Sequence, residues 1–136
     1  MKKLLIVLLC VIVILAVAMY LINPNEIDNR NPIAKKSMVE CTIEWGRLAG
    51  FPDSKSDFII NTEGSSFTRS FRCSFYLPKN DLDEWIRKSP GLKDAEIETV
   101  DPTKQKYIIK PGGGAGYAEA IIDSKKCFVQ IYVSWS

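Results

Sequence analysis

Four carboxylates outside the predicted helices are the residues that could perform acid-base chemistry in this chain. They are Asp57, Glu63, Glu119 and Asp123. Paired carboxylates hydrolyse glycosidic bonds without the help of histidine, and this chain contains no histidine. Its absence removes the usual general base, the usual metal ligand and the Ser-His or Cys-His nucleophile. Because the spacing of the four carboxylates does not distinguish them from solvated surface charges, we expect no catalytic residue, no metal site and no cofactor.

A glycine-rich segment, Pro111 to Gly116, has the composition of a ligand-binding loop. A phosphate-binding loop would end in Gly-Lys-Ser/Thr and lead into a helix, whereas Tyr117 opens a segment typical of a strand. The glycine spacing does not match the dinucleotide-binding pattern either. We therefore predict either a mobile loop or a close backbone approach. Such a loop could still close over a ligand, and Gly113 and Gly114 are its candidate binding residues.

Three aromatic residues, Tyr76, Phe128 and Tyr132, fall on the polar sides of two predicted strands. If the polar sides of these strands adjoin, the three rings form an aromatic patch typical of a binding surface. If helices cover them, the rings belong to the core. The sequence leaves both alternatives open.

The strand that carries Tyr76 has the clearest alternation in the chain. One side of the segment Phe67 to Leu77 is apolar and carries Phe67, Phe71, Cys73, Phe75 and Leu77. Alternation with a period of two residues predicts a central strand with one face in the core. Pro78 ends this strand because proline cannot donate a hydrogen bond to a neighbouring strand.

Phe128 and Tyr132 belong to a predicted C-terminal hairpin. Its strands are Tyr117 to Asp123 and Cys127 to Trp135, and polar residues join them. Two further strands are predicted at Asp57 to Thr62 and at Lys106 to Lys110. The segment Leu92 to Gln105 is polar, and we expect it to be irregular.

Two short helices complete the predicted domain. The first, within Ser37 to Gly50, also fits the alternation of a strand, but its end resembles a last helical turn closed by Gly50. The second, Asp81 to Lys88, is predicted to be capped by Asn80, with acidic residues first and basic residues last. We therefore predict an α+β fold, with an antiparallel sheet of about five strands and two short helices, preceded by one N-terminal transmembrane helix.

The transmembrane helix is predicted from nineteen consecutive apolar residues, Leu4 to Ile22, which are long enough to span a bilayer. Lys2 and Lys3 precede the run, so the N-terminus is expected in the cytoplasm and the domain outside it. Residues 1–22 would be the anchor in the cytoplasmic membrane, 23–36 a polar tether and 37–136 one exported domain. The alternative is a signal peptide cleaved at Ala18, which would release a secreted protein.

Three cysteines lie in the predicted exported domain, namely Cys41, Cys73 and Cys127. Cys73 and Cys127 both fall on the apolar sides of predicted strands, so they are the candidate pair for a disulfide. Burial as small hydrophobic residues is the alternative explanation of both positions.

The charges of the exported part balance. The chain has 18 basic and 16 acidic residues, and two of the basic residues precede the anchor. The sequence therefore shows neither a basic footprint for nucleic acid nor a polybasic segment for anionic lipid.

Several short motifs are similar to those of one family. They are Thr42 to Pro52, Phe71 to Pro78 followed by Asp81, Leu82 and Trp85, Ser89 to Leu92, the glycine loop before Tyr117-Ala118-Glu119, and the ending Ser134-Trp135-Ser136. With them the chain resembles a family of small uncharacterised bacterial proteins that carry a membrane anchor or signal and one exported α+β domain. The resemblance implies a bacterial source and a helix at Thr42 to Leu48, and it brings no activity or ligand.

Together these observations predict a single-pass envelope protein that acts as a non-enzymatic binding module, with another envelope protein as its partner. The alternative is an envelope enzyme that uses carboxylates and has the glycine loop as a lid. A pocket that gathers two facing carboxylates would favour the enzyme, and a flat aromatic patch would favour the binding module.

Overall fold

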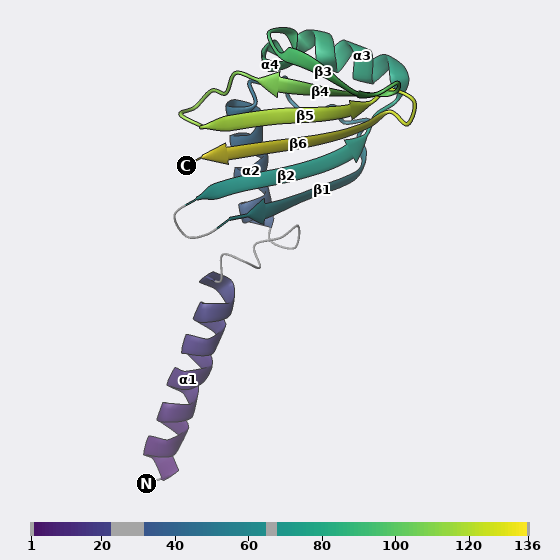
Figure 1. The fold of residues 1–136 in the computed structure, drawn as a ribbon. Coiled ribbons are helices and arrows are strands. Elements are labelled where there is room, and N and C mark those ends of the chain that lie inside the picture. The colour runs from purple at the N-terminus through teal and green to yellow at the C-terminus, as the bar shows by residue number, and fades with distance from the viewer. Residues whose placement is uncertain (1, 23–31, 65–67, 136) are drawn as a thin grey trace.

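The computed structural model of the chain describes residues 2–22, 32–64 and 68–135. These residues form a helix, α1 (Lys2–Ile22), and an α+β domain built on one antiparallel sheet (Figure 1). The strands are β1 (Ser56–Glu63), β2 (Arg69–Tyr76), β3 (Glu96–Asp101), β4 (Lys104–Ile109), β5 (Tyr117–Asp123) and β6 (Phe128–Trp135). Their order across the sheet is β1-β2-β6-β5-β4-β3, so the last strand of the chain lies in the interior, beside β2.

The core lies on one face of this sheet. The alternation predicted for the strand before Pro78 is confirmed, because Phe71, Cys73, Phe75 and Leu77 are all buried, while Phe67 lies outside the described residues. β6 contributes Val129, Ile131 and Val133 to the same face, each fully buried. The hairpin of β5 and β6 is likewise confirmed.

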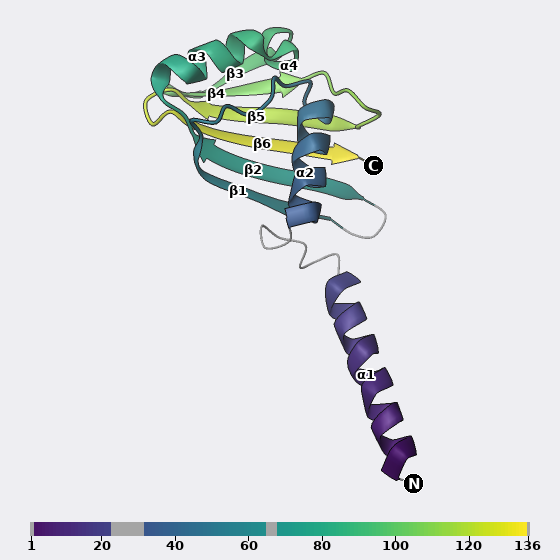
Figure 2. The same ribbon diagram turned by 180° about the vertical axis from the view of Figure 1, so that it is seen from behind.

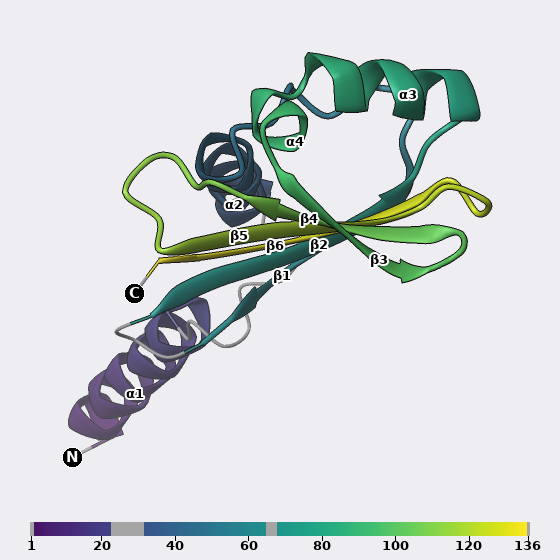
Figure 3. The same cartoon turned by 45° about the horizontal axis from the view of Figure 1, so that its top comes forward.

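The helices α2 (Pro32–Trp45), α3 (Lys79–Lys88) and α4 (Pro90–Lys93) all lie on the core side of the sheet (Figures 2 and 3). α2 crosses β1 and β6, and it buries Met38, Thr42 and Trp45, which recur at helical spacing on one side. α3 buries Leu82 and Trp85 in the same way. The helix predicted within residues 37–50 is confirmed in type.

The bounds of the helices differ from those predicted. α2 begins at Pro32, inside the predicted tether, and Pro is favoured in a first helical turn because its missing N–H has no partner there. It ends at Trp45 rather than near Gly50, and Arg47 then takes a left-handed conformation with φ 48°. α3 starts at Lys79 with Pro78 at the capping position, so the predicted cap at Asn80 is wrong.

The prediction of about five strands and an irregular segment at Leu92 to Gln105 is also wrong in part, since β3 and β4 begin there. β3 is an edge strand that pairs with β4, and five of its six residues are exposed. An exposed edge strand buries neither face, so it has no apolar alternation for sequence analysis to find. The short helix α4 was not predicted either.

None of the helices formed by the described residues combines the length and the apolar character that crossing a membrane requires. The anchor predicted for Leu4 to Ile22 therefore stays a prediction. Within α1 the large apolar side chains from Leu4 to Val17 are exposed. Residues 23–31, the first part of the predicted tether, lie outside the described residues.

The predicted disulfide between Cys73 and Cys127 is absent, because all four cysteines of the chain are free. The register explains why: Cys73 lies opposite Ile131 on β6, whereas the backbone of Cys127 bonds to Leu77, four residues farther along the chain and just past the end of β2. Four strand residues correspond to about 13 Å, well beyond the roughly 7 Å that a disulfide can bridge between Cα atoms. Burial accounts for Cys73, whose side chain faces the core.

Candidate functional site

The helices of the domain leave the other face of the sheet uncovered, and we call it the open face (Figure 3). The three aromatic residues predicted for binding, Tyr76, Phe128 and Tyr132, all lie on it, since their strand neighbours Phe75, Val129 and Val133 face the core. Pairing of β2 with β6 places the polar sides of both strands next to each other. The structure therefore places the three rings on the open face and not in the core, with Tyr76 next to Phe128 and Tyr132 apart from them.

One part of the open face is the pair of Tyr76 and Phe128. The two residues lie directly opposite each other on β2 and β6, and their ring centroids are 4.9 Å apart. Tyr76 is 40% exposed. Adjacent rings at this separation support each other's position, so they present a formed apolar contact area.

A second part is centred on Arg72, which lies opposite Tyr132. The guanidinium carbon of Arg72 lies 4.9 Å from the centroid of the Tyr132 ring. Its Nε and Nη2 donate to the two carboxylate oxygens of Glu63, at 2.7 and 3.2 Å. The hydrogen bond to Glu63 raises the pKa of Arg72, and the two-point contact fixes the plane of the guanidinium over the ring.

Tyr132 on β6 lies between Arg72 on β2 and Tyr117 on β5. Its hydroxyl donates to Oγ of Ser70 at 3.2 Å, and the Ser70 hydroxyl donates to Oγ of Ser134 at 3.0 Å. The ring centroid of Tyr117, on β5, lies 6.2 Å from that of Tyr132. Tyr132 is therefore held by a hydrogen bond at its hydroxyl and by neighbours on both sides of its ring.

The next group is formed by Tyr117, Glu119 and Lys106. The hydroxyl of Tyr117 donates to Oε2 of Glu119 at 2.6 Å, and Nζ of Lys106 lies 3.0 Å from the same oxygen. Burial opposes ionisation of Glu119, but the hydrogen bonds from Tyr117 and Lys106 outweigh it and lower the pKa of Glu119. The same contacts with Glu119 raise the pKa values of Tyr117 and Lys106.

These contacts join into one continuous row across β1, β2, β6, β5 and β4, which we call the belt. It consists of Glu63, Arg72, Tyr132, Tyr117, Glu119 and Lys106. An ion pair lies at each end of the belt, Glu63 with Arg72 and Glu119 with Lys106, and the two tyrosine rings lie between the pairs. Because each side chain already has a partner that fixes its position, a ligand that docks on the belt loses little side-chain entropy.

Sequence analysis missed Arg72, Tyr117 and Lys106 as parts of this site. Arg72 lies on the same side of β2 as Tyr76, so the alternation contained a signal for it. No comparable signal existed for its contact with Tyr132, because this contact depends on the pairing of two strands that are far apart in the sequence.

The four candidate carboxylates do not converge. Glu63 and Glu119 are separate members of the belt, and Asp57 is exposed at the start of β1. Asp123 is buried and accepts the backbone N–H groups of Lys125 and Lys126, at 3.1 and 3.0 Å. It therefore shapes the turn between β5 and β6, and each of the four has a local contact or a solvated position.

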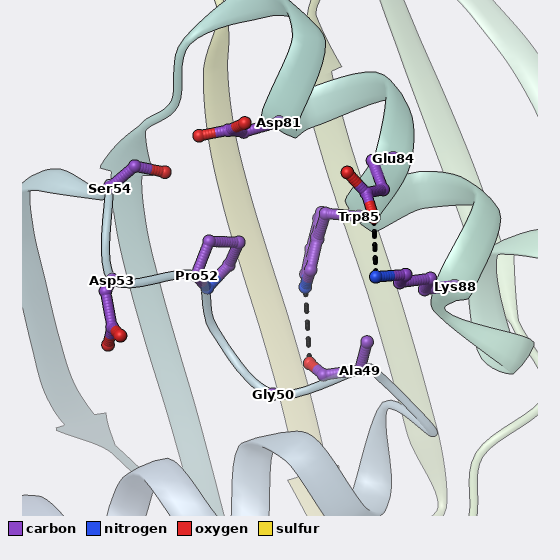
Figure 4. Close-up of a pocket in the computed structure, with 9 residues that line it drawn as sticks. All are labelled: Ala49, Gly50, Pro52, Asp53, Ser54, Asp81, Glu84, Trp85 and Lys88. Carbon is purple, nitrogen blue, oxygen red and sulfur yellow. Dashed lines mark hydrogen bonds and ion pairs between the residues drawn. The ribbon is translucent and has the colours of Figure 1, made fainter.

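A cleft of about 430 Å³ lies between α3 and the loop that follows α2, and it does contain carboxylates, those of Asp53, Asp81 and Glu84 (Figure 4). Figure 4 shows the Asp53 and Asp81 carboxylates pointing in different directions, while Glu84 points to Lys88. The hydrogen bond from Lys88 lowers the pKa of Glu84, which makes Glu84 a poor proton donor at neutral pH. In the described part of the chain no three His, Cys, Asp or Glu side chains are grouped to hold a metal ion.

The glycine loop between β4 and β5 lies at the end of α2, on the core side. The backbone N–H of Gly112 donates to the carbonyl of Trp45 at 2.9 Å, and a Cβ on Gly113 would lie 2.8 Å from the Trp45 ring. Gly113 and Gly114 have φ values of 57° and 78°, which favour glycine. The close backbone approach, one of the two predicted alternatives, explains Gly112 and Gly113 without a ligand.

Comparison of the chain with protein-family models, curated proteins and solved structures finds no match. The family resemblance seen in the sequence therefore stays a prediction.

Proposed function

We propose that the chain is an envelope protein anchored by α1, and that its domain is a non-enzymatic module that binds another envelope protein through the open face. The observation that carries the proposal is the uncovered face itself. Its belt and its pair of Tyr76 and Phe128 place aromatic rings and fixed charges on one continuous surface.

The composition of the open face fits a protein partner. Tyrosine and arginine are enriched at protein interfaces because each supplies a large contact area together with hydrogen-bond donors. Tyr76 and Tyr117 are 40% and 38% exposed, so part of each ring is free for contact. The belt carries charges of both signs, so the complementary surface also carries both signs, which gives specificity rather than general attraction.

The anchor is supported by the sequence and by the exposure of α1. The run from Leu4 to Ile22 contains no charged residue, and a patch of large apolar side chains of this extent is unfavourable in water. The two lysines that precede it favour a cytoplasmic N-terminus and a domain on the outer side. A module fixed at the membrane meets partners in the same envelope at a high effective concentration, so moderate affinity is sufficient.

The test is capture of the partner by the full chain in neutral detergent, from an envelope extract of its own source organism. The open-face variants are Arg72→Glu and Phe128→Glu. The matched control is Arg87→Glu, an identical substitution of an exposed arginine on α3, on the other side of the sheet. Near-UV circular dichroism verifies that all three variants keep the native packing.

We expect the wild type and the Arg87→Glu control to retain one protein in a fixed ratio, and both open-face variants to lose it. Cross-linking with mass spectrometry should then place that protein next to β2 and β6. If all variants retain the same proteins, or if the wild type retains none, the open face is not the binding surface.

A further inference from the structure

A groove of about 610 Å³ lies on the core side of the sheet, between α2 and the start of β1. Three lysines, Lys35, Lys36 and Lys55, line it together with the apolar side chains of Val39, Ile43 and Phe58. The sequence contains no polybasic segment here, because Lys55 is about twenty residues away from the other two. The fold gathers the three lysines into one site.

The charge of this groove is largely uncompensated. Among the described residues only Lys36 has a carboxylate partner, Glu40, at 3.9 Å and with both side chains well exposed. Lys35 and Lys55 are half-buried and lie over the same ring, with Nζ 5.3 and 5.8 Å from the centroid of Phe58. Lys55 also donates from Nζ to the carbonyl of Pro52 at 3.4 Å. The ring contacts keep both ammonium groups beside Phe58, and neither has a carboxylate partner among the described residues, so a bound anion would gain their attraction.

The position of Lys35 and Lys36 adds to this effect. Both lie near the N-terminus of α2, where the helix dipole is positive, and the first turn contains no acidic residue. Lysine there is less favourable than at any other place in the helix. An anion between these lysines and Lys55 would be stabilised by all three charges.

We infer that this groove binds the phosphate headgroup of an anionic phospholipid, with its apolar side chains in contact with the glycerol and upper acyl region of the lipid. The inference rests on the proposed function in one respect, namely the insertion of α1 into the membrane. Positive charges beside apolar side chains are the usual composition of surfaces that lie against anionic bilayers. Ile33, in the first turn of α2 next to the groove residue Pro32, is 84% exposed.

The length of the connection to α1 makes the membrane the nearest source of such an anion. Nine residues separate α1 from α2, so the first turn of α2 lies at most about 35 Å from the end of α1. Attraction between lysines and headgroups extends only about 8 Å at physiological ionic strength. A connection of nine residues is long enough for the groove to reach the headgroups, and such binding would be effectively intramolecular.

The experiment places the full chain in nanodiscs of phosphatidylcholine alone, or of equal parts phosphatidylcholine and phosphatidylglycerol. Brief acetylation followed by mass spectrometry then measures the reactivity of each lysine. Lys93, Lys125 and Lys126 are exposed lysines outside the groove and serve as internal controls. A third arm adds soluble glycerophosphate to the phosphatidylcholine nanodiscs.

We expect Lys35 and Lys55 to react about fivefold more slowly with phosphatidylglycerol present, the ratio that corresponds to the attraction of one lysine to an anionic surface. The control lysines should not change. Equal rates in both lipids, or slowing of all lysines alike, would overturn the inference. Protection by glycerophosphate alone would show that the groove takes a soluble phosphate instead of a lipid, which also overturns it.

A pair of double variants separates the groove from its surroundings. In Lys35→Gln/Lys55→Gln the slowing of Lys36 by phosphatidylglycerol should disappear, whereas in the control Lys93→Gln/Lys125→Gln it should persist. If Lys36 responds identically in both variants, the three lysines do not form one site. Failure of the chain to co-elute with nanodiscs of phosphatidylcholine would instead contradict the anchor of the proposed function, so the two failures are distinguishable.

Discussion

Replacement of Phe75 by alanine tests the assignment of the two faces of the sheet. The Phe75 side chain is fully buried, and its ring packs against Phe51, Phe58 and Trp85, with centroids 5.1, 6.0 and 5.7 Å away. Removal of a buried phenylalanine ring costs about 3 to 5 kcal/mol of folding free energy. Since a whole domain is stable by only about 5 to 15 kcal/mol, Phe75→Ala should leave a marginally stable protein.

The matched control is Tyr76→Ala, because Tyr76 is the next residue of β2 and points to the open face. It is 40% exposed and has a ring contact with Phe128, so we expect a loss of about 1 kcal/mol. Urea unfolding of the full chain in neutral detergent, followed by tryptophan fluorescence, measures both losses. With a typical slope, the midpoint for Phe75→Ala should fall by roughly 2 M urea. A loss under about 1 kcal/mol for Phe75→Ala, or a larger loss for Tyr76→Ala, would show that the faces are reversed.

Three further predictions concern packing, ionisation and the belt. Gly91→Ala should lower stability by about 1 to 3 kcal/mol or prevent folding, because its Cβ would lie 2.0 Å from the carbonyl oxygen of Gly46. The control is Gly50→Ala, whose Cβ would meet no atom within 4 Å and which should be nearly neutral. Thermal unfolding measures both. Burial raises the pKa of the Cys73 thiol from 9.0 to about 12. As the pH rises, the unfolded chain therefore loses this proton before the folded chain does, which favours unfolding. Between pH 9 and 12 the stability of the wild type should fall by up to about 4 kcal/mol more than that of Cys73→Ala. Arg72→Met breaks an exposed ion pair, so urea unfolding should show a change in the free energy of unfolding of less than about 1 kcal/mol. The same variant should abolish capture of the partner. A large loss of stability would show that the belt serves folding and not binding.

Elements of the fold can be predicted from the sequence where the pattern that specifies them is local. The alternation of Phe71, Cys73 and Phe75 specifies which side of β2 faces the core, because a shift by one residue would expose all three. The C-terminal hairpin is specified in the same way, by two alternating segments and a short polar turn. The edge strand β3 has no such alternation, since its residues are largely exposed on both sides and only pairing with β4 makes it a strand.

Contacts between distant segments could not be predicted from one sequence. The belt exists because β6 inserts beside β2, which places Tyr132 opposite Arg72. In the sequence, Arg72 and Tyr132 only lie on the polar sides of two alternating segments that are far apart. The groove lysines are similar, because Lys55 approaches Lys35 only after α2 has packed across β1. Side-chain periodicity identifies what faces the core, and the way strands pair decides which residues meet on the surface.

The two proposed surfaces lie on opposite sides of the sheet, and this arrangement has a functional consequence. The groove faces the side of α2, whereas Tyr132 and the rest of the belt face away from it. Contact of the groove with headgroups would therefore turn the side of α2 toward the membrane and leave the belt uncovered on the opposite side of the sheet. It would also limit rotation of the domain, so that fewer orientations are lost when a partner docks. The lipid contact would orient the belt without touching the partner, so the groove lysines should affect partner binding only through that orientation.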